Sequence, residues 1–120
     1  MPRDFRLYVD DMLEAVKQIR SYVEGYNWET FSSDRKTQDA VIRNLEVIGE
    51  AARNLPEIIK ASASEVEWRK ITGLRNILIH EYFGISVPVL WDIVQNRLNP
   101  LEEACLKILA NLDESTKPQS

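Results

Sequence analysis

The spacing of the apolar residues constrains the fold of this chain more than any other feature. Along nearly the whole sequence they recur at steps of three and four, which places them on one face of an α-helix. The first stripe predicts a helix from about Arg3 to Gly25, and the glycine favours a stop there. The second stripe follows Asp34, a predicted N-terminal cap, and ends at Pro56. Its apolar positions are Val41, Leu45, Ile48, Ala52 and Leu55.

A third helix is predicted in the middle of the chain. Ser64 and Glu67 have the S-x-x-E spacing of a capping box, so we expect this helix to begin at Ser64 and to run towards Gly84. Two short segments connect the predicted helices. Residues 26–33 are predicted to form a loop, and residues 57–64 a short turn.

The last stripe predicts a long helix from Val87 to Leu112, kinked where Pro100 removes a backbone hydrogen bond. Helices joined by short connections favour an all-α fold, an antiparallel bundle of four to five helices. The length of 120 residues suits one domain. We therefore expect a single helical domain over residues 1–114 and a polar tail over residues 115–120.

Composition excludes several other classes of protein. Four glycines and five prolines are few for a β-sandwich or barrel, and the longest apolar runs of four or five residues are too short to span a membrane. The first residues carry acids where a secretory signal needs apolar side chains, so a cytoplasmic location is expected. One cysteine, Cys105, and one histidine, His80, exclude a disulfide framework and a cysteine-based or multi-histidine metal site. No cofactor is predicted.

The charge is distributed unevenly. A net charge of −4 disfavours binding of nucleic acid by the whole surface. Residues 34–75 are nevertheless slightly basic, with eight basic and seven acidic side chains, so a polyanion site is most expected there. Several cations of this region could follow an RNA strand or could equally be ordinary helix-surface charges. They are Arg35, Lys36, Arg43, Arg53, Arg69 and Lys70.

The third predicted helix has apolar residues on two faces. At 100° per residue, one face carries the expected core stripe of Ile71, Leu74, Ile77 and Leu78. On the other side, Ile79 and Phe83 lie among Arg75, Asn76 and His80. A helix that is apolar on two faces usually buries both, so we expect a second copy of the chain or another helix to cover this side. Spacing alone leaves a purely structural role for the arginine and histidine open.

The remaining candidates have structural explanations. Trp28, Trp68 and Trp91 are predicted to anchor the core or an interface rather than to stack on bases. Cys105 falls within the last apolar stripe and is expected to be an inert core thiol.

The segment W-R-K-I-T-G-L-R-N-I-L-I-H-E-Y-F-G, residues 68–84, resembles the signature of the HEPN ribonucleases. It is most similar to the HepT toxin branch, whose motif is R-x-x-x-x-H-x-Y. Arg75, His80 and Tyr82 match the motif positions, and Asn76 matches the residue that often follows the arginine. The resemblance extends to A-V-I-R-N-L-E-V-I-G-E-A-A and V-L-W-D-I-V, which stand earlier and later in the chain at compatible spacing.

This resemblance implies a HEPN-like bundle that forms a homodimer through the helices carrying the motif. Arg75 and His80 would be the catalytic residues of a composite RNA-cleaving site, with tRNA among the candidate targets. The partner implied is a nucleotidyltransferase antitoxin of the MNT type, in a type VII-like toxin–antitoxin module. In that family the antitoxin neutralises the toxin by transferring AMP to the motif tyrosine, here Tyr82.

The residue types suit metal-independent cleavage of RNA, because RNA carries its own nucleophile in the 2′-hydroxyl. His80 can transfer protons near neutral pH, and Arg75 can stabilise charge on the phosphate. Asn76 is either a supporting group for the histidine or a surface amide. Tyr82 is either the AMP acceptor or an ordinary boundary tyrosine. The alternative function is a catalytically silent helical subunit that binds a nucleotidyltransferase as its partner or substrate, which the acidic balance favours.

Overall fold

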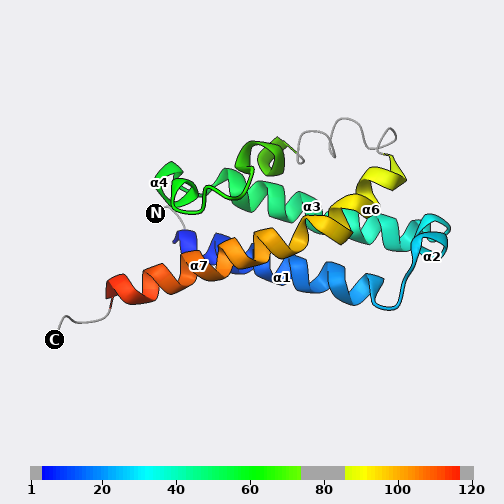
Figure 1. Cartoon of the computed structure of the whole chain (residues 1–120), viewed down its shortest axis with the longest axis horizontal. Helices are drawn as coiled ribbons and strands as arrows, with labels where there is room; N and C mark the ends of the chain where they lie inside the picture. Colours follow the sequence, from blue (N-terminus) through cyan, green and yellow to red (C-terminus); the bar gives the residue numbers. More distant parts are fainter. Residues whose placement is uncertain (1–3, 74–85, 117–120) are drawn as a thin grey trace.

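The computed structural model describes residues 4–73 and 86–116. Within these ranges the regular elements are α-helices and none is a strand, which confirms the all-α class. Two long helices, α1 and α3, lie side by side in opposite directions, and α6 and α7 continue one another across them (Figure 1). In chain order the helices are α1 Phe5–Val23, α2 Trp28–Ser32, α3 Arg35–Arg53, α4 Glu57–Ala61, α6 Val87–Asn96 and α7 Leu98–Thr116.

Helix α1 is close to the first helix predicted. The Asp4 side chain accepts a hydrogen bond from the Arg6 backbone N–H at 3.0 Å and so caps the start. Gly25 lies just past the end with φ of +76°, a conformation that favours glycine. The buried stripe faces α3 and α7 and consists of Val9, Met12, Ala15, Val16 and Ile19.

The predicted loop over residues 26–33 is wrong, because it contains the short helix α2. Asn27 and Thr30 form a reciprocal capping box: the Thr30 backbone N–H donates to the Asn27 side chain, and the Asn27 backbone N–H donates to the Thr30 hydroxyl. Phe31 is fully buried and lies 4.8 Å from Trp91, measured between ring centroids. A five-residue helix is too short to show a period in the sequence, so tertiary packing decides it.

Asp34 caps α3, as predicted, and it also connects α3 to the segment before α2. Its carboxylate accepts hydrogen bonds from the Tyr26 hydroxyl at 2.6 Å, the Thr37 hydroxyl at 2.7 Å and the Thr37 backbone N–H at 3.1 Å. These donors, the Tyr26 hydroxyl foremost, lower the pKa of Asp34 to about 2. The buried residues of α3 confirm the second apolar stripe: Val41, Ile42, Leu45, Ile48, Gly49, Ala51 and Ala52.

The predictions for residues 57–67 are also wrong in detail. Residues 57–61 form helix α4 instead of a turn, and Ser64 begins no helix; helical structure resumes at residue 68. The helix begins after Glu67, whose backbone carbonyl accepts hydrogen bonds from the backbone N–H groups of Lys70 and Ile71. The burial of Ala63 and Val66 holds the segment between α4 and residue 68 against the core, in a conformation that does not continue the helix.

The last apolar stripe is divided into two helices at Arg97, not kinked at Pro100. Pro100 lies in the first turn of α7, where an N–H group has no partner within the helix, so the proline costs no hydrogen bond there. Arg20 of α1 then ties the start of α7 to the bundle, through an ion pair with Glu102 at 2.7 Å and a hydrogen bond to Asn99. Cys105 is buried in α7, as predicted, and its pKa is raised by that burial to about 12.

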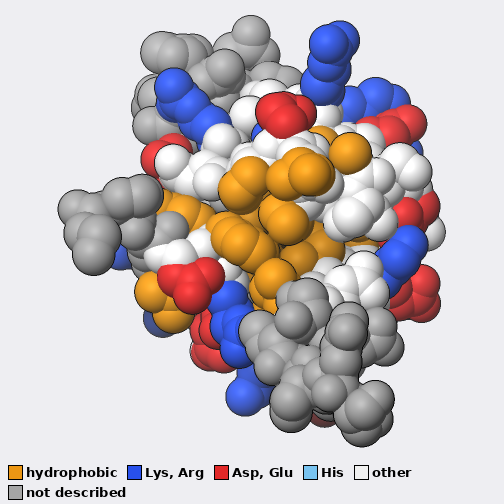
Figure 2. Space-filling view, turned by 90° about the vertical axis from the view of Figure 1, so that its left-hand side faces the viewer, with side chains coloured by type: hydrophobic (Ala, Val, Ile, Leu, Met, Phe, Trp, Pro, Cys, Tyr) orange, Lys and Arg blue, Asp and Glu red, His pale blue; other side chains and the backbone are white. Residues whose placement is uncertain are grey.

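Apolar side chains gather at the end of the bundle where the start of α1, the end of α7 and α4 lie (Figure 2). Ile58 of α4 is the most exposed large apolar residue of the described part, at 78%. In residues 4–73 and 86–116 no helix combines the length and the apolar character that crossing a membrane requires.

Candidate functional site

The residues predicted from the sequence to form the site, Arg75, Asn76, His80 and Tyr82, lie outside the described residues. The same is true of Ile79 and Phe83, the predicted dimer contacts. The structure does describe the segment that leads into the motif. Residues 68–73 are helical, and Gly73 stands two positions before the arginine. The described part of the site consists of the contacts that anchor residues 68–73 and the hollows beside them.

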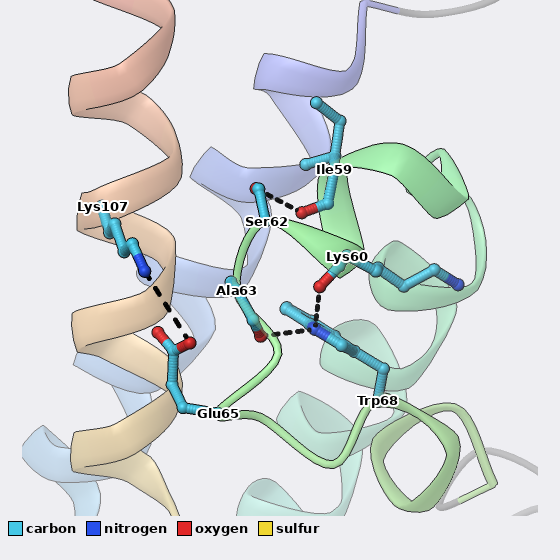
Figure 3. A network of polar contacts seen from close by, with 7 residues as sticks. All are labelled: Ile59, Lys60, Ser62, Ala63, Glu65, Trp68 and Lys107. Carbon is cyan, nitrogen blue, oxygen red and sulfur yellow. Dashed lines mark hydrogen bonds and ion pairs between the residues drawn. The ribbon is translucent and has the colours of Figure 1, made fainter.

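Trp68 anchors the start of the helix (Figure 3). Its indole Nε1–H donates to two backbone carbonyl oxygens, those of Lys60 and Ala63, each at 3.0 Å. The ring is half-buried and packs against the core. One side chain thus ties the helical segment of residues 68–73, which precedes the motif in the sequence, to the end of α4. This role agrees with the prediction that Trp68 is an anchor.

The turn between α4 and this helix is held by its own contacts. The Ser62 hydroxyl donates to the Ile59 carbonyl at 2.6 Å, and Ala63 is fully buried. On the far side, Glu65 lies 3.9 Å from the ammonium of Lys107 in α7 (Figure 3). Both charged groups are about half exposed, so this ion pair contributes little. The burial and the backbone hydrogen bonds are what position the turn.

Glu67 is the last residue of the turn, and its negative charge stabilises the helix that begins at residue 68. Its carboxylate lies 2.9 Å from the Lys70 ammonium, and the hydrogen bond from Lys70 lowers the pKa of Glu67. A negative charge is favourable near a helix N-terminus. Lys70 is therefore engaged within its own helix, whereas the neighbouring Arg69 has no ion-pair partner in the part of the chain that the structure describes.

Two hollows flank residues 68–73, and they differ in chemistry. The wider hollow, of about 800 Å³, contains the cations Lys60 and Arg69 and one acid, Glu57. Its other lining residues are Ala61, Ser64, Val66, Trp68, Thr72 and Gly73. The described residues of the wider hollow therefore carry a net positive charge, and Ser64 and Thr72 add two hydroxyl groups.

The narrower hollow, of about 390 Å³, has a mainly apolar lining, and its charged residues include more acids than cations. Val66, Ile71, Val89, Ile93, Pro100 and Leu101 form the apolar part. Its charged residues are Glu65, Glu67, Asp92, Lys70 and Arg97, three acids against two cations. Arg69 and Lys70, adjacent in sequence, thus line different hollows.

The cations predicted as an RNA-tracking surface are not all brought together. Arg35 and Lys36 begin α3 and Arg53 ends it, so they are separated by most of a 19-residue helix, about 27 Å. Arg43 is exposed midway along the same helix. Of the predicted set, only Arg69 lines the positively charged hollow.

The sequence pattern does not reveal the other residues of the wider hollow. Lys60 belongs to α4, which is too short to show a helical period, and Ser64 and Thr72 are common residue types. Gly73 does carry a signal in the sequence, because a glycine inside a predicted helix needs a reason. No group of three or more His, Cys, Asp or Glu side chains within residues 4–73 and 86–116 is placed to hold a metal ion.

Comparison with known proteins places this geometry in context. The family described as Ribonuclease HepT-like matches residues 12–108, most of the chain and the whole motif segment. A candidate RNase of Methanocaldococcus jannaschii is 45% identical over 105 residues, covering 86% of this chain and 87% of that protein. A candidate ribonuclease HepT of Thermococcus cleftensis is 41% identical over 102 residues, covering 85% of this chain and 93% of that protein.

A third relative is longer. A gamma-glutamylcyclotransferase and candidate RNase of Methanocaldococcus jannaschii is 34% identical over 115 residues, which cover 96% of this chain. The chain spans about half of that protein, 52% of its length. No solved structure matches the chain significantly.

Proposed function

Because this chain belongs to the HepT-like ribonuclease family, we propose that it is an endoribonuclease whose catalytic residues are Arg75 and His80. The observation that carries the proposal is the motif R-x-x-x-x-H-x-Y at residues 75–82, inside the segment that the family match covers. The all-α architecture supports it, as does the anchored helical segment of residues 68–73 directly before the motif.

Two histidines complete the reaction. One neutral His80 takes the proton of the ribose 2′-hydroxyl, and the 2′-oxygen attacks the adjacent phosphorus. The bond from phosphorus to the 5′-oxygen breaks, and that oxygen receives a proton from a second, protonated His80. The products are a 2′,3′-cyclic phosphate and a 5′-hydroxyl. Arg75 donates two hydrogen bonds to the phosphate oxygens as their charge grows, and Asn76 supports the histidine.

A mechanism in which one histidine acts as the base and another as the acid needs a homodimer, because each chain has one histidine. A two-fold dimer around the motif helices brings two His80 side chains into one cleft, with Ile79 and Phe83 as apolar contacts. Light scattering at micromolar concentration is expected to give about twice the chain mass of 13.9 kDa. A monomer under these conditions contradicts the composite site.

The biological setting that fits this enzyme is a toxin–antitoxin module of the type VII kind, acting in the cytoplasm as a single domain over residues 1–114 with a polar tail over 115–120. The antitoxin is a nucleotidyltransferase that transfers AMP to Tyr82. Each AMP brings about one negative charge beside Arg75 and fills the space that RNA enters, so cleavage stops without a change of fold. One candidate for the RNA substrate is tRNA.

The nuclease is tested by comparing wild type with His80→Ala and Arg75→Ala on a labelled RNA. Both variants are expected to fold and to lose cleavage, and EDTA is expected to leave wild-type cleavage unchanged. Cleavage that EDTA abolishes and Mg²⁺ restores contradicts this mechanism. A wild type that folds and dimerises, accepts AMP, but cuts no RNA favours the silent partner subunit instead.

The modification is tested by intact-mass spectrometry after incubation with the nucleotidyltransferase and ATP. Wild type is expected to gain AMP, and Tyr82→Phe, which keeps the ring but removes the acceptor oxygen, is expected to gain none. Equal adducts on both proteins contradict Tyr82 as acceptor and leave the nuclease proposal standing.

A further inference from the structure

We propose that the wider hollow beside residues 68–73 binds the phosphodiester backbone of the RNA substrate and leads the strand to the cleavage site. The residues responsible are Lys60, Ser64, Arg69, Thr72 and Gly73. This inference rests on the proposed ribonuclease function and deepens it, because it assigns a substrate-binding surface outside the motif.

Arg69 supplies the principal charge. It is exposed, lines the hollow, and has no ion-pair partner among the described residues, so its guanidinium is available to a ligand. A guanidinium can donate two parallel hydrogen bonds to a phosphate. Ser64 and Thr72 add hydroxyl groups to the same wall. The neighbouring Lys70 lines the other hollow and is paired with Glu67, so the two cations are not equivalent.

Lys60 forms an ion pair with Glu57, which competes with an RNA phosphate for the lysine. The two charged groups are 3.2 Å apart, the lysine side chain is only 12% exposed, and the glutamate is 93% exposed. A phosphate in the hollow competes with the glutamate for the lysine and is repelled by the glutamate. The acid therefore weakens RNA binding at this wall, and removing it strengthens binding.

Gly73 provides independent support. Among residues 4–73 and 86–116, no atom lies within 4 Å of a Cβ built on this glycine, so packing against the described part of the chain does not require glycine there. Helical geometry favours alanine over glycine, so the residue is unfavourable for the helical conformation it occupies. A glycine that lines an open hollow and makes no close packing contact with the described residues fits close approach of a ligand to the backbone.

The chemistry of the two hollows favours RNA as the occupant of this one. Among the described lining residues, the wider hollow has two cations against one acid, whereas the narrower one has three acids against two cations and a mainly apolar lining. A polyanion is attracted to the first and repelled by the second. The lining of the wider hollow includes Gly73, which stands two residues before Arg75 in the sequence, so an RNA strand bound there lies against a segment that directly precedes the motif in the chain.

The test measures binding of a fluorescent single-stranded RNA oligomer to full-length protein that also carries His80→Ala, so that the RNA stays intact. Arg69→Gln and Lys70→Gln form a matched pair, since each removes one positive charge at adjacent positions. Arg69→Gln is expected to weaken binding roughly tenfold and to make the salt dependence of log K shallower by about 0.7. Lys70→Gln is expected to change affinity less than about twofold, because its charge is paired and faces the other hollow.

Two further variants predict effects that a general loss of folding cannot produce. Glu57→Gln is expected to tighten RNA binding about threefold, since it frees Lys60 and removes a repelling charge. Gly73→Ala is expected to raise the thermal midpoint while it weakens RNA binding severalfold, because the added methyl group stands where the backbone approaches the phosphate.

The outcomes separate this inference from the proposed function. If wild type cuts RNA but Arg69→Gln and Lys70→Gln bind alike, or Gly73→Ala binds as tightly as the parent, the hollow is not the RNA path while the nuclease stands. If Gly73→Ala instead lowers the dimer mass in light scattering with unchanged RNA affinity, the occupant is a second copy of the chain. If wild type neither binds nor cuts RNA, the proposed function itself fails.

Discussion

Replacing Trp68 by phenylalanine tests whether one indole group holds the helical segment of residues 68–73, which precedes the motif, in place. The substitution keeps an aromatic ring but removes the N–H that donates to the Lys60 and Ala63 carbonyls. A lost hydrogen bond of this kind costs about 1 kcal/mol net, and the smaller ring buries less apolar area at a cost on the order of 1 kcal/mol. The free energy of unfolding is therefore expected to fall by about 2 kcal/mol, and the thermal midpoint by roughly 8 °C.

Trp28→Phe is the matched control. Trp28 is 39% exposed, and its indole donates no hydrogen bond to a residue of the described part, so we expect a loss under about 0.5 kcal/mol. Urea unfolding followed by circular dichroism compares the two without depending on tryptophan emission. Arg75 follows Trp68 by seven residues in the sequence, and residues 68–73 between them are helical. RNA cleavage by Trp68→Phe is therefore expected to fall severalfold at temperatures where it is fully folded. Equal stability losses in both variants, or unchanged cleavage by folded Trp68→Phe, refute the anchor.

Three further predictions concern the scaffold. The pKa of Asp34 is lowered in the fold to about 2, so its contribution to stability is present above its ordinary value near 4 and is lost as pH falls towards 2. Tyr26→Phe removes the donor that lowers this pKa most. The free energy of unfolding of this variant, measured by urea titrations between pH 6 and pH 2, should therefore fall less with decreasing pH than that of the wild type. Cys105, buried with a pKa of about 12, should react with a thiol reagent far more slowly in native protein than in urea; equal rates contradict its burial. A double-mutant cycle on Arg20 and Glu102 should give a coupling of about 0.5–1 kcal/mol that 1 M salt removes, because both groups are partly exposed; coupling that persists in salt points to a packing role.

The long helices could be predicted from the sequence because each repeats its apolar residues over many turns. The burial of Val9, Met12, Val16 and Ile19 in α1 follows from their spacing alone. The Asp34 cap was equally local, since a carboxylate three residues before a free N–H group can bind it without help from the rest of the chain. The motif at residues 75–82 was also evident from the sequence, and its role stays a proposal.

Tertiary structure decided the elements whose reasons are not local. Helix α2 forms because Phe31 packs on Trp91, sixty residues later, and the turn after α4 takes its shape from the burial of Ala63 and Val66. Ser64 has the spacing of a cap, but the buried turn prevents it from acting as one. The different surroundings of Arg69 and Lys70 depend on what lies on either side of their helix, α4 on one side and α6 with α7 on the other. A sequence gives the angle between two side chains on a helix, but the neighbours they meet are set by how distant segments pack to bury their apolar faces.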